Sequence, residues 1–151
     1  MADTNKTTPE RAPINTLAIG ECGSGGRANA GRAAALRHHD QLKGILTGAG
    51  VVILIAGLGG GTGSGVTPIL AAWSRNAGAR TVAVAVTPFD FGGSIKQSAN
   101  ALKSLLRNAD QVIHFSNQAV GVELGDDATL IDAFAVQEQR ISDWVQGLSL
   151  G

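Results

Sequence analysis

The chain has 151 residues, 44% of them apolar, and its 12 basic side chains balance its 12 acidic ones. This length predicts one domain with a real core, and the composition excludes a disordered polyelectrolyte. A net charge of zero gives no general attraction to nucleic acid or anionic membrane. A single cysteine and the lack of a long apolar run predict a cytoplasmic protein with no membrane span.

The first half of the chain is expected to alternate strands and helices. Residues 1–13 are polar and predict a disordered tail, whereas the apolar run over 14–20 is typical of a buried strand. A helix is expected over 26–39, followed by a turn region over 44–50. Residues 51–56 are continuously apolar and largely β-branched, which predicts a central parallel strand buried on both faces.

The second half continues the alternation. Thr67 and Pro68 are suited to cap and open a helix that ends near Asn76. The further expected elements are a strand over 81–87, a loop over 88–93, a helix over 95–108, a strand over 111–115, an irregular segment over 117–128 and a helix over 130–148. This order predicts an α/β fold, with a Rossmann-like three-layer parallel sheet of four strands covered by helices on both faces, in one domain over residues 14–151.

One glycine-rich run carries the strongest chemical signal, because it follows an expected strand and precedes an expected helix. Glycines let consecutive backbone N–H groups converge on one anion, and a helix N-terminus adds its dipole. Two hydroxyls in the run can also donate to phosphate oxygens. The predicted phosphate-binding residues are Gly59, Gly60, Gly61, Thr62, Gly63, Ser64 and Gly65.

This run, with its flanking segments, resembles the signature of the tubulin/FtsZ superfamily. Similar stretches are the Ala-Gly-Leu before the run, the Thr-Pro-Phe-Asp-Phe after the strand over 81–87, and the Leu-Ile-Asp-Ala-Phe of the last helix. The resemblance covers about residues 14–150. It implies a shortened, FtsZ-like version of the family's nucleotide-binding domain, with GTP or GDP as the ligand.

The loop after the first expected strand is similar to the opening loop of tubulin, where backbone amides meet the phosphates. The resemblance implies nucleotide contacts from Gly20, Glu21, Cys22 and Gly23. Glu21 stands where tubulin's loop has a glutamine. Since a carboxylate repels phosphate unless a cation intervenes, Glu21 is the candidate Mg²⁺ ligand; the alternative is that it points to solvent.

The resemblance also implies where the sugar and base lie. Pro88 begins the sugar-contacting loop, and Lys96 stands where FtsZ has an arginine that faces phosphate. Asn117 and Phe134 match positions that contact guanine, and Glu138 replaces the family's asparagine one helical turn after Phe134. A carboxylate there can accept from guanine's ring N–H and amino group together. Plain core or solvated roles remain open for Lys96, Phe134 and Glu138.

Two stretches of the family pattern have no counterpart in the sequence. One lies between the opening helix and the strand over 51–56, and the other is the second domain, whose acidic loop activates water on the neighbouring subunit's nucleotide. The resemblance therefore implies a subunit that binds guanine nucleotide, hydrolyses it very slowly alone, and caps or regulates an FtsZ-like filament.

Two other interpretations stay open. The run Gly-Ser-Gly-Gly-Arg-Ala over 23–28 fits the loose fingerprint of a dinucleotide-binding module for NAD(P), although no acid follows at the end of the next strand. The chain could also be a degenerate fragment that serves only as an interaction module. A Walker-type ATPase is excluded, because no Gly-Lys-Ser/Thr follows a glycine loop.

Overall fold

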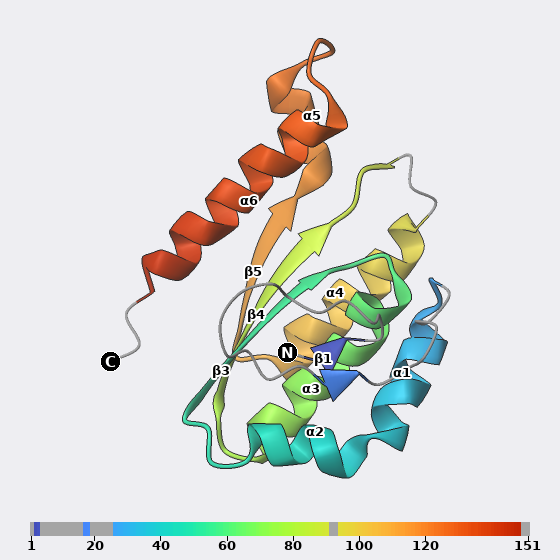
Figure 1. Cartoon of the computed structure of the whole chain (residues 1–151), viewed down its shortest axis with the longest axis vertical. Coiled ribbons are helices and arrows are strands. Elements are labelled where there is room, and N and C mark those ends of the chain that lie inside the picture. The colour runs from blue at the N-terminus through green and yellow to red at the C-terminus, as the bar shows by residue number, and fades with distance from the viewer. Residues whose placement is uncertain (1, 4–16, 19–25, 91–93, 149–151) are drawn as a thin grey trace.

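The computed structural model describes residues 2–3, 17–18, 26–90 and 94–148. These residues form an α/β fold in which strands and helices alternate along the chain (Figure 1). The elements are β1 (Ala2–Asp3), β2 (Leu17–Ala18), α1 (Ala28–Arg37), α2 (His39–Leu46), β3 (Val51–Gly57), α3 (Gly61–Asn76), β4 (Arg80–Thr87), α4 (Ile95–Asn108), β5 (Gln111–Ser116), α5 (Asn117–Leu124) and α6 (Leu130–Gln146).

The main sheet has three parallel strands in the order β3-β4-β5. Val51 pairs with Arg80 at the start of β3, and Val82 pairs with Gln111 at the start of β5. β4 is the central strand, and its residues 81–85 are all buried. The expectation that the strand over 51–56 is central and buried was wrong: β3 lies at an edge of the sheet within the described residues, and its side chains Val51 and Ile55 are 41% and 49% exposed.

The main core lies between the sheet and helices α3 and α4. Small side chains on the central strand, Ala83 and Ala85, face Ala71 of α3 and Leu105 of α4 in one apolar cluster. Because alanines occupy this face of β4, the helices can approach the sheet closely. Leu105 is the largest fully buried side chain of this cluster.

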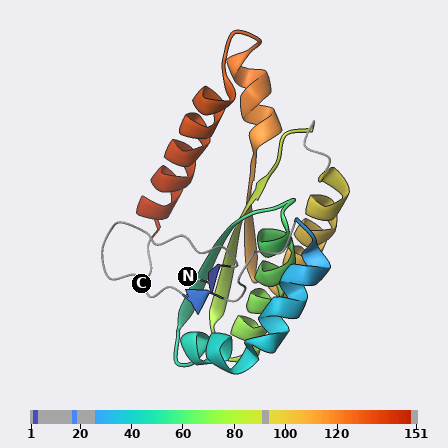
Figure 2. The ribbon, with the colours of Figure 1, turned by 45° about the vertical axis from the view of Figure 1, so that its right-hand side comes forward.

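Helices α1 and α2 pack on α3 and form a second cluster around Ala35, Leu42 and Val66. Figure 2 shows α1 to α4 on one side of the sheet.

The expectation of a single helix over 26–39 was wrong. The helix breaks at His38, because the His38 φ of −108° and ψ of 26° are not helical. The His38 backbone N–H donates to Ala34 O and Ala35 O and so closes α1. α2 then runs to Leu46, into the region expected as a turn.

Helices α5 and α6 form a hairpin on the opposite side of the sheet (Figures 1 and 2). It is joined to the loop after β4 through a small cluster of Phe89, Val120 and Ala133. α6 begins with a capping box, in which Asp132 N donates to Thr129 Oγ1 and Thr129 N donates to Asp132 Oδ2. Hydrogen bonding of the Asp132 carboxylate by the Thr129 backbone N–H, followed by hydrogen bonding from the Thr129 side chain, lowers the pKa of Asp132.

An ion pair links the two helices of this hairpin. Arg140 Nη2 of α6 donates to Glu123 Oε2 of α5 over 2.6 Å. The hydrogen bond from Arg140, followed by the charge of Arg140, lowers the pKa of Glu123.

Residues 117–128 were expected to be irregular, and that expectation was wrong for α5. The N-terminus of α5 is capped by the Ser116 hydroxyl, which accepts from Ala119 N.

Of the strand expected over 14–20, the two described residues do not pair with the main sheet. Leu17–Ala18 pairs in parallel with Ala2–Asp3 in a separate two-stranded sheet. The apolar run over 14–20 identified a strand but not its neighbour, because ladder hydrogen bonds come from the backbone and carry no side-chain signature. The other residues of that run, and residues 4–13 of the expected tail, lie outside the described residues.

Candidate functional site

The carboxyl ends of β3, β4 and β5 lie at the same edge of the sheet, because all three strands run parallel. A helix begins close after two of them, α3 at Gly61 and α5 at Asn117, and Pro88 follows β4. Ligands of open α/β sheets bind at this edge. Most of the described residues that the sequence predicts to contact nucleotide therefore lie at or next to this edge of the sheet.

The glycine run forms the turn from β3 into α3. Leu58 N donates to Val86 O over 2.8 Å, which ties the turn to β4. Gly59 has a φ of 104°, a conformation that favours glycine, and its N–H donates to Ser64 Oγ over 2.8 Å. That bond uses an acceptor position of the Ser64 hydroxyl and leaves its proton for another acceptor. Gly60 is the N-cap, with no side-chain capping hydrogen bond.

Helix α3 starts at Gly61, six residues before the expected start at Thr67. Thr67 and Pro68 therefore lie inside the helix and do not open it. The first-turn N–H groups of a helix have no acceptor within the helix itself, and they carry the positive end of its dipole. The start of α3, with Gly60 as its N-cap, is consequently suited to bind an anion.

Three glycines serve packing between elements. A Cβ on Gly63 would clash with the carbonyl oxygen of Gly57, and a Cβ on Gly31 would clash with that of Gly61. A Cβ on Gly65 would clash with the carbonyl oxygen of Ala28. These positions let α3 lie against β3 on one side and α1 on the other. By contrast, a Cβ on Gly60 would meet no described atom within 4 Å.

Two neighbouring segments reach the glycine turn. A Cβ built on Gly59 would lie 3.2 Å from Pro88 Cγ and 2.7 Å from Ser94 Oγ, so the loop after β4 and the residue before α4 both adjoin it. Gln97, in the first turn of α4, donates from Nε2 to Gly59 O over 2.7 Å. Sequence reasoning missed Ser94 and Gln97, since neutral polar residues at a helix start give no specific signal.

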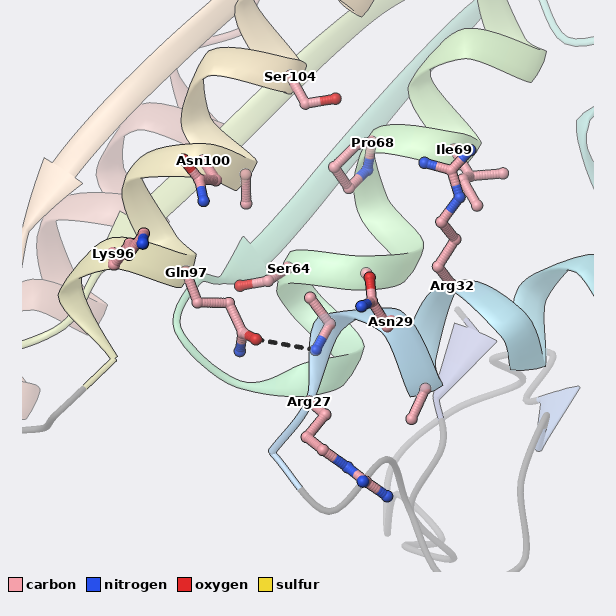
Figure 3. A pocket seen from close by; sticks show the side chains of 14 residues that line it. Arg27, Asn29, Arg32, Ser64, Pro68, Ile69, Lys96, Gln97, Asn100 and Ser104 are labelled. Carbon is pink, nitrogen blue, oxygen red and sulfur yellow. Dashed lines mark hydrogen bonds between the residues drawn. The ribbon is translucent and has the colours of Figure 1, made fainter.

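A groove lies over α3, between α1 and α4 (Figure 3). Its volume is about 880 Å³, and its described lining residues include Arg27, Arg32 and Lys96 but no aspartate or glutamate. Lys96 precedes Gln97 on α4, and the buried Ser64 reaches the same groove. Figure 3 shows Gln97 and Ser64 between the two flanking helices. The cations make this side of the glycine turn electropositive.

The three residues nominated for base contact lie on the two helices of the α5–α6 hairpin, Asn117 on α5 and the other two on α6. Asn117 is the first residue of α5, and its Oδ1 accepts from Gln137 Nε2 over 3.2 Å. Gln137 is buried on α6 next to the exposed Glu138, and Phe134 lies one turn earlier. The bond to Gln137, which sequence reasoning missed, therefore brings the start of α5 beside the predicted base-contacting turn of α6.

Phe134 has both a core contact and an exposed surface. Its ring lies edge-to-face against Phe89, with a centroid distance of 5.6 Å and an interplanar angle of 76°. Phe89 is buried, whereas Phe134 is 46% exposed. The ring is thus anchored at one edge and has surface available for a planar ligand.

The first predicted phosphate loop, with Gly20, Glu21, Cys22 and Gly23, lies outside the described residues. The structure therefore does not test the Mg²⁺ role of Glu21. Within the part of the chain that the structure describes, no group of three or more histidine, cysteine, aspartate or glutamate side chains is placed to hold a metal ion. The described helices include none long and apolar enough to span a membrane.

Comparison with known proteins gives this parallel α/β fold a family. Residues 2–122 match the Tubulin/FtsZ family, GTPase domain. The chain is 35% identical over 129 residues to the cell division protein FtsZ of Pseudomonas aeruginosa, and 38% identical over 129 residues to that of Haemophilus influenzae. Each alignment covers 84% of this chain, and 33% and 31% of the two relatives. The chain thus spans about a third of the length of these curated relatives.

Solved structures of FtsZ and CetZ proteins have the same fold as this chain. The empty FtsZ dimer of M. jannaschii has a TM-score of 0.76 at 31% identity, over 83% of this chain and 37% of that one. CetZ2 from Haloferax volcanii, in a GTPγS-bound protofilament, has a TM-score of 0.77 at 24% identity, over 95% of this chain and 46% of that one, which shows the fold alone. The chain belongs to the tubulin/FtsZ family, and the matched residues are those of its GTPase domain.

Proposed function

We propose that this chain is a cytoplasmic guanine-nucleotide-binding protein that holds GTP or GDP at the carboxyl edge of its sheet. The observation that carries the proposal is the start of α3, where glycine at the N-cap leaves the first helical turn accessible to an anion. Family membership supports it independently. Residues 14–151 act as one nucleotide-binding domain in this proposal.

Each part of the nucleotide has a proposed contact. The phosphates lie at Gly59 to Gly61, with the Ser64 hydroxyl and Lys96 nearby, and the ribose lies beside Pro88. The base lies against the exposed surface of Phe134, with Glu138 accepting from guanine and Asn117 beside it. A Mg²⁺ ion, if bound with GTP, is held through Glu21.

The test is a titration of the purified protein with labelled GTP, GDP, ATP and NAD. The proposal expects saturable binding of both guanine nucleotides and weaker binding of ATP. Preferential binding of NAD would favour the dinucleotide-binding alternative, and no binding of any nucleotide would favour the interaction-only alternative. A GTP affinity that changes with Mg²⁺ in the parent protein, but not in Glu21→Gln, would support the metal role.

A narrower role within this proposal is regulation of an FtsZ-like filament by capping. It rests on family membership alone. Mixing this chain below stoichiometry with a polymerising FtsZ should then change both light scattering and GTP turnover. Unchanged polymer mass and turnover over a wide range of ratios would reject the capping role without affecting the proposal of nucleotide binding.

A further inference from the structure

Gln97 makes three hydrogen bonds to the backbone of segments that are distant in sequence. Its Nε2 donates to Gly59 O over 2.7 Å and to Gly26 O over 2.9 Å. Its Oε1 accepts from Ala28 N over 2.9 Å, the bond drawn in Figure 3. The partners are 38 to 71 residues away along the chain.

These bonds use both N–H donors and the carbonyl oxygen of the Gln97 carboxamide. Such a group has one carbonyl oxygen and two N–H donors. Ala28 N can only donate, whereas the Gly26 and Gly59 oxygens can only accept, so the orientation of the amide is fixed by its partners. Glutamate has no donor for the two carbonyls, and methionine, of similar shape, has neither a donor nor a strong acceptor.

The joined segments are the ones that would meet the phosphates. Gly59 carries the left-handed turn that leads β3 into α3. Gly26 and Ala28 lie at the start of α1, a few residues after the loop over 20–23 that the sequence nominates as the first phosphate loop. Among the described residues, Gln97 is the side chain that hydrogen-bonds to both places.

We infer that Gln97 is a positioning residue for phosphate binding. It holds the glycine turn and the start of α1 at a fixed separation, so that both can contact one phosphate chain. Loosening either segment also removes a partner from the amide that holds the other, so the two segments open together. The inference rests on the proposed guanine-nucleotide binding and adds to it a residue that works through backbone position, without touching the ligand.

The experiment compares the full chain with Gln97→Met and Gln97→Glu. Amide hydrogen exchange without ligand is measured over residues 26–32 and 57–63, together with affinities for GTP, GDP and guanosine. Gln97→Met should raise exchange in both segments and lower the affinity for GTP and GDP by tenfold or more. Guanosine, which has no phosphate, should bind Gln97→Met as it binds the parent protein.

Two further variants make the result specific. Gln97→Glu keeps the acceptor for Ala28 N but places a carboxylate against two carbonyl oxygens, so exchange should rise more over 57–63 than over 26–32. Leu106→Ala, farther along α4 at an exposed position that is not among the described residues lining the groove, should leave exchange and affinity unchanged.

Unchanged exchange in both segments of Gln97→Met would overturn the inference, as would an equal loss of GTP and guanosine affinity, which indicates general damage to the fold. If Gln97→Met is too unstable to purify, the exchange pattern of Gln97→Glu decides in the same way. If the parent protein binds no guanine nucleotide, the proposed function fails and the phosphate role of Gln97 fails with it. Raised exchange in both segments would then still show that Gln97 joins them.

Discussion

Gly63 lies with its Cα against the carbonyl oxygen of Gly57, so that any Cβ on Gly63 would clash with that oxygen. Gly57 ends β3 and Gly63 lies in the first turn of α3, so this contact sets how the strand turns into the helix. The glycine at position 63 is therefore required by packing, whatever ligand the turn binds.

Gly63→Ala should accordingly destabilise the protein by about 2 kcal/mol or more, because the added methyl forces α3 away from β3. The measurement is the free energy of unfolding from urea denaturation. Gly60→Ala is the matched control within the same run, since its Cβ meets no described atom and its φ of −82° suits alanine. Equal stability of Gly63→Ala and the parent protein would contradict the packing role.

Gly60→Ala also tests the anion site. Its methyl group would occupy open space at the N-cap of α3, next to the first turn where the phosphates are proposed to lie. We expect about tenfold or more weaker GTP binding, with a stability cost of about 1 kcal/mol or less, because alanine is a poorer N-cap than glycine. Gly50→Ala, at the other end of β3 and equally free of contacts, should leave GTP affinity unchanged. Normal affinity in Gly60→Ala would move the phosphates elsewhere.

The alternation of elements was predictable from the sequence, whereas the start of α3 was not. Short apolar runs, largely β-branched in β3 and β4, located β3, β4 and β5 to within about a residue of their observed bounds. Helix propensity placed the start of α3 after the glycines, because glycine is unfavourable in a helix interior. Tertiary packing overrides that propensity here, since α3 can meet β3 and α1 only without side chains at Gly63 and Gly65.

The hydrogen bonds that arrange the candidate site were not predictable. Gln97 and Gln137 are neutral side chains on amphipathic helices, where a solvated position is the usual expectation. Their partners are far along the chain: backbone groups for Gln97 and the Asn117 side chain for Gln137. A sequence pattern records which residues lie on a helix face, and it does not record which distant loop that face meets.

The capping box of α6 should make stability depend on pH. The Asp132 pKa is lowered in the folded state, so its ionised form stabilises the fold above the ordinary aspartate pKa of about 3.9. That stabilisation is lost as pH falls through the lower pKa of the folded state. The free energy of unfolding of the parent should therefore fall more steeply in acid than that of Asp132→Asn, which cannot ionise but keeps an oxygen to accept from Thr129 N.

Asp127→Asn is the control for this titration, because it removes an exposed carboxylate from the same hairpin but lies outside the capping box. Its stability should follow the parent protein through the acid range. If the free energy of unfolding of Asp132→Asn changes with pH as that of the parent protein does, the bonds with Thr129 do not lower the Asp132 pKa in the folded state, and this prediction is wrong.

The proposed base selectivity for guanine assigns recognition to Glu138. Guanine presents a ring N–H and an amino group side by side, and a carboxylate can accept from both, whereas adenine has no such donor pair. Glu138→Ala should weaken GTP binding by roughly tenfold or more, as expected for losing hydrogen bonds to a charged group, and should leave the weaker ATP binding unchanged. The GTP affinity of Glu138→Gln should lie between that of the parent protein and that of Glu138→Ala, because glutamine keeps one acceptor but turns an amino group toward guanine's donors.

The control for Glu138 is Asp143→Ala, which removes another exposed carboxylate from α6 at a position five residues on, and so on a different face of the helix. Its GTP affinity should match the parent protein, which separates base recognition from a change in the helix's overall charge. Phe134 lies one turn before Glu138 and keeps its contact with Phe89 in both variants, so the stacking surface stays intact. If Glu138→Ala binds GTP as tightly as the parent does, guanine is recognised by other residues, and the assignment of this turn of α6 to the base is wrong.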